Sequence, residues 1–315
     1  PNMNGLDALP KMIAAKPGLK VLMSSTLTTQ GASVTIRALE LGAADYIAKP
    51  EASRIGGAEG FRQELMAKAR ALCGRTRGVW PALPPGTNAP VSAAAAPPIQ
   101  PRTSPTSLRV ATPRASTFTG VRKVSALLIG ASTGGPPALR NFLVGLGPDW
   151  KLPILIVQHM PATFTAILAE HLDKALSMTV VEAKQGMSVE AKHVYIAPGD
   201  YHMTLKGSEI APTLHLDQSA PVNWCRPAVD PMFKSAVDIY GKNLMAVVLT
   251  GMGHDGRDGA QAIVNAGGLV MAQDEASSVV WGMPGAVAEA GLAEIIRPVD
   301  GLSAACKAIS RGEKA

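Results

Sequence analysis

A proline-rich segment in the middle of the chain most limits how these 315 residues can fold. Residues 81–120 hold nine prolines, a run of alanines over 93–96, and many Ser and Thr residues. Such a segment buries too little apolar surface to offset the entropy of ordering it, so we interpret it as an extended linker. The sequence therefore predicts three parts: a first part over 1–72, a flexible linker over 73–121 and a second domain over 122–315.

The charge distribution agrees with a linker. The chain has a net charge of +6, yet no Asp or Glu occurs from Met66 to Pro148. The basic residues of that stretch are spread out and do not gather on one helical face with aromatic residues between them. This favours a solvated connector over a nucleic-acid surface, so we expect no nucleic-acid partner.

The cysteines bear on the cellular compartment. Cys73, Cys225 and Cys306 are widely spaced and odd in number, which argues against a disulfide framework and against a thiolate metal site. No run approaches the roughly 18 apolar residues of a membrane helix, and no signal peptide opens the sequence. We expect a soluble, cytoplasmic protein without membrane insertion. For Cys225, beside Arg226, the default expectation is a packing role.

Helical and strand-like patterns alternate in the first part. Helices are predicted over 6–15, 31–41 and 59–72, and short strands over 21–23 and 46–48. This order is typical of a parallel α/β domain. However, about 70 residues supply only about two strands, where a doubly wound sheet needs about five.

The second part alternates in the same way and is long enough for a complete domain. Several strand candidates are continuous apolar runs, as expected for a sheet covered on both faces. The predicted strands are 124–129, 154–158, 194–197, 244–249 and 269–272, and the predicted helices are 136–146, 164–175, 228–239 and 258–266. We therefore predict an α/β fold with a doubly wound, mostly parallel sheet.

A serine lies where chemistry is expected in such a sheet. The first strand of the second part ends in Gly-Ala-Ser-Thr-Gly-Gly over 130–135, and prolines then open a helix. Ser132 is thus placed at the carboxyl edge of the sheet, and the amides of Thr133 and Gly134 could face a developing oxyanion. Taken alone, the same turn could bind a phosphate or only close a corner between strand and helix.

Two further residues follow strand ends. His159 comes directly after one predicted strand, and Asp255 lies in a glycine-rich loop after another. Alone, such a His is most often structural, and Asp255 or Asp258 could cap the next helix. Together with Ser132 they supply a nucleophile, a base and an orienting carboxylate at one sheet edge.

The alternatives are weaker. The chain order Ser, His, Asp and the absence of G-x-S-x-G argue against a lipase-type α/β-hydrolase. The five other histidines have no metal-ligand spacing, so we expect no cofactor in the second part. His254 is the nearest rival base, but its neighbour Asp255 cannot orient it as readily as a carboxylate from another segment could.

Six motifs in order carry a family resemblance. Over nearly all of 124–300 the chain resembles the catalytic domain of CheB, the chemotaxis protein-glutamate methylesterases. The motifs are LIGASTGG at 128–135, QHMP at 158–161, YIAPGD at 195–200, RP with VD over 226–230, LTGMGHDG at 249–256 and QDEASSVVWGMP at 273–284.

The resemblance implies an activity and roles for single residues. It makes Ser132 the nucleophile, His159 the general base and Asp255 its orienting acid, and the region of Met252 contributes to the oxyanion site. It implies hydrolysis of glutamyl methyl esters on methyl-accepting chemotaxis receptors, with release of methanol, and deamidation of receptor glutamines. Two alternatives stay open: a non-catalytic adaptor for receptors or kinase, and a hydrolase of small esters.

The first part resembles the C-terminal half of a CheY-like, flavodoxin-fold receiver. Ser25 matches the switch hydroxyl, Tyr46 the switch aromatic, and Lys49, before Pro50, the phosphate-sensing lysine. The phosphoacceptor Asp and the acidic pair that binds Mg²⁺ in an intact receiver would precede residue 1, so we expect a truncated chain. In intact relatives, phosphorylation by the chemotaxis histidine kinase is expected to activate the esterase. We expect that control to be lost here, and whether the half receiver folds or inhibits stays open.

Overall fold

The structure is a computed structural model that describes residues 3–49, 57–74 and 123–313. From residue 75 onward the predicted linker lies outside the described residues, and so does Pro50. The predicted part boundaries therefore stay a prediction. None of the helices in the described residues is long and apolar enough to cross a membrane.

A seven-stranded sheet forms the centre of the second part, in the order β11-β10-β9-β3-β4-β6-β5. Every neighbouring pair in it is parallel. This confirms the prediction of an α/β fold with a parallel sheet. Its strands are β3 (Ala126–Ala131), β4 (Ile154–Gln158), β5 (Thr179–Glu182), β6 (His193–Ile196), β9 (Leu244–Val248), β10 (Leu269–Gln273) and β11 (Ile295–Arg297).

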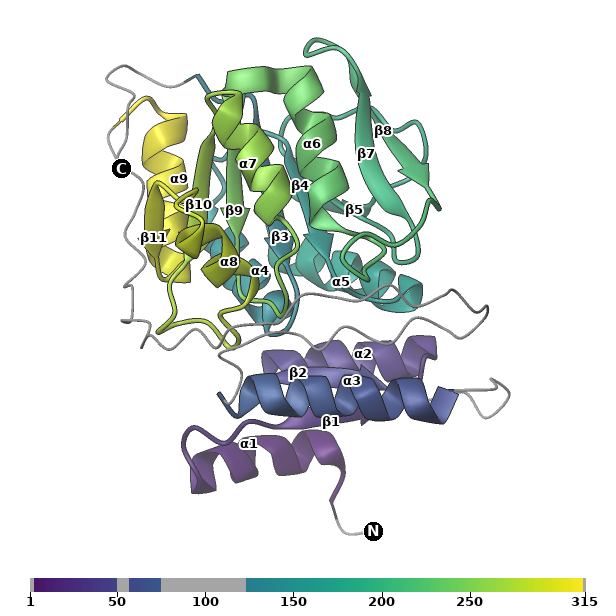
Figure 1. Ribbon diagram of the computed structural model, residues 1–315. Coiled ribbons are helices and arrows are strands. Elements are labelled where there is room, and N and C mark those ends of the chain that lie inside the picture. The colour runs from purple at the N-terminus through teal and green to yellow at the C-terminus, as the bar shows by residue number, and fades with distance from the viewer. Residues whose placement is uncertain (1–2, 50–56, 75–122, 314–315) are drawn as a thin grey trace, which may run out of the picture.

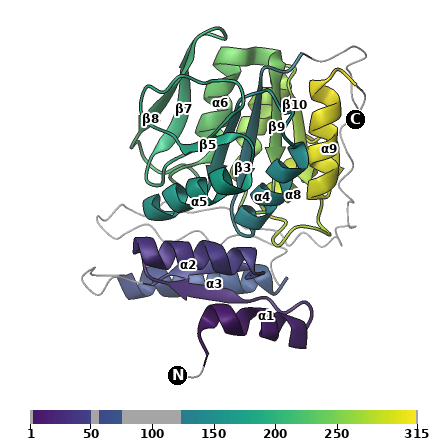
Figure 2. The same ribbon diagram turned by 180° about the vertical axis from the view of Figure 1, so that it is seen from behind.

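Helices cover both faces of this sheet (Figures 1 and 2). One face packs against α4 (Gly135–Leu146), α5 (Ala162–Ala175) and α9 (Val299–Ser310), in one apolar core. The other packs against α6 (Val229–Tyr240), α7 (Arg257–Asn265) and α8 (Met283–Glu289), in a second core. Because helices cover both faces of the sheet, the side chains on both faces of its strands are buried. This explains the continuous apolar runs in the strand sequences.

The strand order reverses beside β3. The chain moves outward from β3 to β4, and later returns to place β9 on the opposite side of β3. In doubly wound sheets, ligands bind at the carboxyl ends of the strands at this reversal. The loops that follow β3, β4 and β9 are the ones that carry Ser132, His159 and Asp255.

Several elements were not anticipated from the sequence. These are β5, β11, α8, α9, the short 3-10 helix η1 (Gly241–Asn243), and an antiparallel hairpin of β7 (His202–Gly207) and β8 (Pro212–Asp217). The missed sheet strands β5 and β11 have only four and three residues. Such short strands carry little periodic signal, and their pairing to a neighbour establishes them.

The first part is folded, which answers the question left open by the sequence. It contains α1 (Gly5–Ala15), β1 (Leu22–Ser25), α2 (Thr29–Glu40), β2 (Asp45–Ala48) and α3 (Gly57–Leu72), and its two strands pair in parallel. Two strands alone are marginal in water. The missing support comes from the second part, because Ile36 and Leu39 of α2 share an apolar core with α4 and α5. Both views show α2 against these helices (Figures 1 and 2).

Candidate active site

Ser132 directly follows β3 and is held by its backbone. Its amide donates to the Thr250 carbonyl at 3.0 Å, and its carbonyl accepts from Gly135 N at 2.7 Å and Gln158 Nε2 at 2.9 Å. Gly134 then adopts φ +76° before α4 begins. A β-carbon at residue 134 would lie 2.6 Å from a Val279 side-chain carbon, so this turn requires glycine.

The predicted oxyanion residues lie around this turn. Gly251, beside Met252, packs so closely that a β-carbon there would lie 2.9 Å from Ser132 Cβ. No hydrogen bond within the described residues uses the backbone amides of Thr133, Gly134 or Met252. These amides are therefore available as donors, and their oxyanion role stays a prediction.

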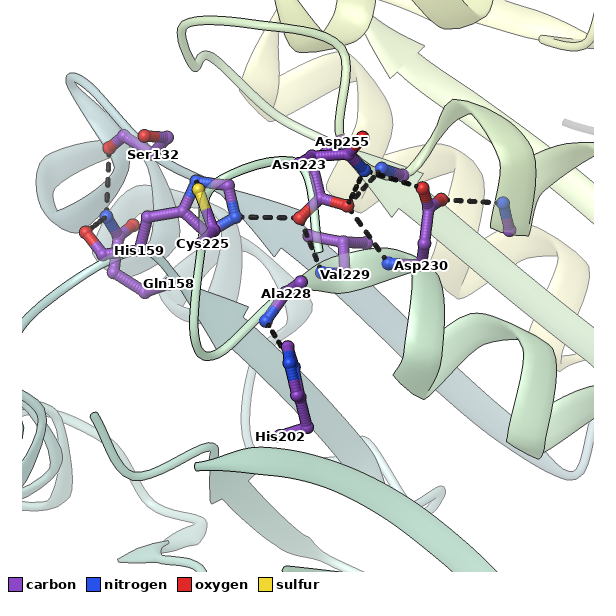
Figure 3. A network of polar contacts seen from close by, with 12 residues as sticks. Ser132, Gln158, His159, His202, Asn223, Cys225, Ala228, Val229, Asp230 and Asp255 are labelled. Carbon is purple, nitrogen blue, oxygen red and sulfur yellow. Dashed lines mark hydrogen bonds and ion pairs between the residues drawn. The ribbon is translucent and has the colours of Figure 1, made fainter. Parts of the chain in front are cut away.

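His159 and Asp255 are in contact. Their Nε2 and Oδ2 atoms lie 2.8 Å apart (Figure 3). The His159 amide donates to the Ala131 carbonyl at 3.1 Å, next to Ser132. The Asp255 carboxylate also accepts from the amides of Val229 at 2.6 Å and Asp230 at 3.2 Å. Asp255 thus caps α6, not the helix that follows it in sequence.

Burial and these contacts shift the pKa values of the pair. Burial opposes ionisation of Asp255, but hydrogen bonds from His159, Val229 and Asn223 hold its carboxyl pKa below the ordinary value. Burial also lowers the pKa of His159, but attraction to Cys225 and the bond to Asp255 outweigh this and raise it from 6.5 to about 10. This arrangement therefore keeps His159 protonated at neutral pH.

The Ser132 hydroxyl is not bonded to the base in this arrangement. Among the described residues it has no hydrogen bond to His159. The second ring nitrogen, Nδ1, instead lies 3.4 Å from the Cys225 sulfur (Figure 3). The structure thus brings His159 and Asp255 into contact and places Ser132 near them without a hydrogen bond to His159. The predicted triad stays a prediction. Catalytic hydrogen bonds often tighten only when substrate binds.

Sequence reasoning missed two residues of this site. Asn223 Nδ2 donates to Asp255 at 2.9 Å and to Asp230 at 2.8 Å, so one amide links two carboxylates. Burial, with the nearby charge of Asp255, raises the pKa of Asp230. Cys225 was expected only to pack. Nothing local in the sequence marks either residue, because each contact joins distant segments.

The rival interpretations gain no support from the geometry. His254 is exposed on its loop and directs no side-chain hydrogen bond to the site within the described residues. His202 is buried, with Nδ1 accepting from the Ala228 amide and Nε2 beside the Ala220 carbonyl, as a structural histidine would be. In the described parts of the chain, no three His, Cys, Asp or Glu side chains cluster as metal ligands.

The first part reaches the site directly. Thr133 Oγ1 donates to Asp45 Oδ2 at 2.9 Å in a buried contact, and Lys68 Nζ pairs with the same carboxylate at 3.0 Å. The ring of Tyr46 stacks on Phe164 of α5, with centroids 4.6 Å apart and an angle of 9°. The predicted switch aromatic is therefore an interface residue.

The other predicted switch residues lie on the first part itself. Ser25 Oγ donates to the Gly31 carbonyl at 2.9 Å. The amide of Lys49, an exposed residue, donates to the Ser25 carbonyl at 2.6 Å. These contacts place Ser25 and Lys49 side by side, and their switch role stays a prediction.

A cleft of about 390 Å³ separates the two parts at this point. Tyr46 and Lys68 line it from the first part, and His159, Trp224 and Cys225 line it from the second. The candidate base thus faces a cleft that residues of both parts line.

Comparison with known proteins identifies the family. The family profile described as CheB methylesterase matches residues 127–306. The chain belongs to the CheB methylesterase family. A CheB-family relative, "protein-glutamate methylesterase/protein-glutamine glutaminase 2" of Caulobacter vibrioides, is 50% identical over 303 residues, covering 95% of this chain and 80% of the relative. One from Maricaulis maris is 47% identical, covering 94% and 78%.

A solved structure agrees with the CheB assignment. The crystal structure of the Thermotoga maritima CheB methylesterase catalytic domain is 42% identical, with a TM-score of 0.56. The match covers 57% of this chain and 96% of that domain. The resemblance of the first part to a receiver is not tested by it and stays a prediction.

Proposed function

We propose that this chain is a protein-glutamate methylesterase and protein-glutamine glutaminase that acts on methyl-accepting chemotaxis receptors. The names of its relatives, at 50% and 47% identity, support this activity. The observation that carries the mechanism is the 2.8 Å contact between His159 and Asp255, at the sheet edge beside Ser132. It supplies a half-buried, oriented base near a hydroxyl.

The reaction follows from these groups. Ser132 Oγ attacks the γ-carbonyl of a methylated glutamate while His159 takes the hydroxyl proton and Asp255 stabilises the imidazolium. The amides of Thr133, Gly134 and Met252 stabilise the oxyanion. His159 returns the proton to the leaving group, and methanol departs from an acyl-enzyme that water then hydrolyses. A glutamine side chain would release ammonia by the same route.

The base has to change partners before it can act. Asp255 holds Nε2, so Nδ1 is the nitrogen that remains for Ser132. Nδ1 faces Cys225 in this arrangement, and His159 is protonated at neutral pH. Catalysis therefore requires His159 to lose a proton and the Ser132 hydroxyl to take the place of the sulfur. Substrate that enters the cleft would favour this exchange, because its γ-carbonyl would lie beside the Ser132 turn, where the oxyanion forms when the hydroxyl attacks.

The first part restrains the site in this proposal. Its contacts with Thr133 and Phe164 keep Tyr46 and Lys68 over the cleft. A receptor helix would have to displace them to reach Ser132. The contacts favour retained inhibition over the loss of control expected from the sequence. In a chain with a complete receiver, phosphorylation by the chemotaxis histidine kinase would weaken the same contacts.

Methanol release from methylated receptor tests the activity. Ser132→Ala should abolish release, and the control Ser310→Ala, at an exposed serine of α9, should leave it unchanged. Equal release from wild type and Ser132→Ala would reject the serine mechanism. Receptor binding without any methanol release by the wild type would favour the adaptor alternative.

A further inference from the structure

A thiol, an imidazole and a carboxylate stand in sequence at the site. Cys225 Sγ lies 3.4 Å from His159 Nδ1, and His159 Nε2 lies 2.8 Å from Asp255 Oδ2. This is the arrangement that activates a nucleophile: a base within reach of it, and an acid that orients the base. The serine mechanism makes no use of Cys225.

A strained turn fixes the sulfur in this position. Val222 and Cys225 exchange two backbone hydrogen bonds, of 2.9 and 3.1 Å, around Asn223 at φ +51° and Trp224 at φ +65°. Two consecutive non-glycine residues in the left-handed region are uncommon and need surrounding contacts to persist. Asn223 provides them, since its side chain is bonded to Asp255. The carboxylate that orients the base therefore also anchors the turn that carries the thiol.

Cys225 lies at the cleft, where small solutes can approach it. Cys225 is partly exposed and lines the cleft of about 390 Å³. The other two cysteines provide natural comparisons. Cys306 is buried in the apolar core, and Cys73 is exposed but has no base beside it within the described residues. Of the three, Cys225 alone combines exposure with an adjacent imidazole.

We propose that Cys225 is a reactive thiol activated by His159. Peroxides oxidise this thiol to a sulfenic acid, and the sulfenic acid inactivates the esterase. The part that concerns inactivation rests on the proposed function. The proton on His159 Nδ1 is the one that the Cys225 thiol gives up, so the two side chains form a thiolate–imidazolium pair. The thiolate sulfur attacks one oxygen of hydrogen peroxide. An S–O bond forms while the O–O bond breaks, and the leaving hydroxide takes the proton from His159 and departs as water. Cys225 is oxidised and the peroxide is reduced.

The loss of esterase activity follows from geometry. The added oxygen is bonded to the sulfur that faces Nδ1 and can hydrogen-bond to that nitrogen, so it competes with the Ser132 hydroxyl for Nδ1. His159 then cannot take the serine proton. A thiol reductant removes the oxygen and restores the base, because a sulfenic acid is reversible.

Peroxide oxidation of the full chain tests this, with mass spectrometry of the three cysteine peptides and methanol release followed in parallel. Cys225 should oxidise at least about tenfold faster than Cys73, as expected for a base-activated thiol. Esterase activity should fall at the Cys225 rate and return with dithiothreitol. Cys225→Ala should retain its own initial activity under peroxide, whereas Cys73→Ala should lose activity like the wild type.

His159→Gln separates activation from mere exposure. In this variant, oxidation of Cys225 should slow to the rate of Cys73, with folding checked by circular dichroism. Oxidation of Cys225 no faster than Cys73 in the wild type, or unchanged by His159→Gln, would overturn the proposal. A wild type without methanol release would refute the proposed function alone, since the oxidation rates would still report on the thiol.

Discussion

The two parts of this protein gain their order in different ways. The second part holds a seven-stranded parallel sheet between two apolar cores, one built from its own residues and one to which the first part adds residues. The first part has two strands, and its helix α2 packs against α4 and α5 in a shared apolar core. The candidate catalytic residues therefore lie on a part that forms its own sheet, whereas the first part depends on the surface of the second part for its core.

The largest expected effect lies within the second part. Asp255→Asn should lower methanol release by about 10³ to 10⁴-fold, because an amide cannot stabilise the imidazolium or hold the productive tautomer. The first part should stay docked, since Asp255 makes no contact with it in the described residues. Asp258→Asn, at an exposed carboxylate nearby, is the matched control. Activity within tenfold of wild type would remove Asp255 from the mechanism.

A change at the interface between the two parts should increase methanol release. Tyr46→Ala removes the stack on Phe164 and the contact with Lys68, whose Nζ lies 4.9 Å from the ring centroid. Truncation of a buried aromatic costs about 3–5 kcal/mol, enough to undock a marginal part. Proteolysis of residues 3–74 should accelerate and methanol release should increase. Tyr201→Ala, at a partly exposed ring on the second part, should do neither. Faster proteolysis without faster release would mean that the docked part does not inhibit.

The pH dependence of methanol release should show whether Cys225 influences His159. Burial lowers the pKa of His159, but Cys225 and Asp255 raise it to about 10, so activity should increase with pH through that value. Cys225→Ala removes one source of the increase, and the rising limb should move to lower pH. An identical rate profile in both proteins would show that the sulfur does not influence the base.

The same shift predicts a change in stability. The pKa of His159 in the folded state exceeds its ordinary value of 6.5, so protonated His159 stabilises the folded state. This stabilisation is complete below about pH 6.5 and is lost as pH rises to about 10. Urea unfolding across this range should show a smaller decline for Cys225→Ala. An equal decline would exclude a link between the sulfur and the charge of His159.

The smallest expected effect concerns the first part alone. Asn4 caps α1, with its Oδ1 accepting from the Asp7 amide at 2.9 Å. Asn4→Ala should cost about 1 kcal/mol. Hydrogen exchange should therefore increase in α1 by about fivefold and remain unchanged in β3 and β4. Equal increases in hydrogen exchange in α1 and in β3 and β4 would show that the two parts unfold as one unit. The two parts would then not differ in how they gain their order.

Most of the framework of the second part could be predicted from local sequence patterns. Apolar runs predicted β4 at its observed bounds and β3, β6, β9 and β10 within two residues, because buried parallel strands carry a strong local signal. The sequence also placed Ser132, His159 and Asp255 at strand ends, which in a parallel sheet is enough to bring them to one edge.

The partners of these groups could not be predicted from the sequence, because they depend on how distant segments pack together. The contacts of Cys225 with His159, and of Thr133 with Asp45, join residues 66 and 88 positions apart. The docking of α2 on α5 likewise depends on two complementary apolar surfaces. Periodicity reports which face of an element is buried but not what it is buried against. For that reason the sequence predicted a triad, and the fold decided that a thiol stands beside its base.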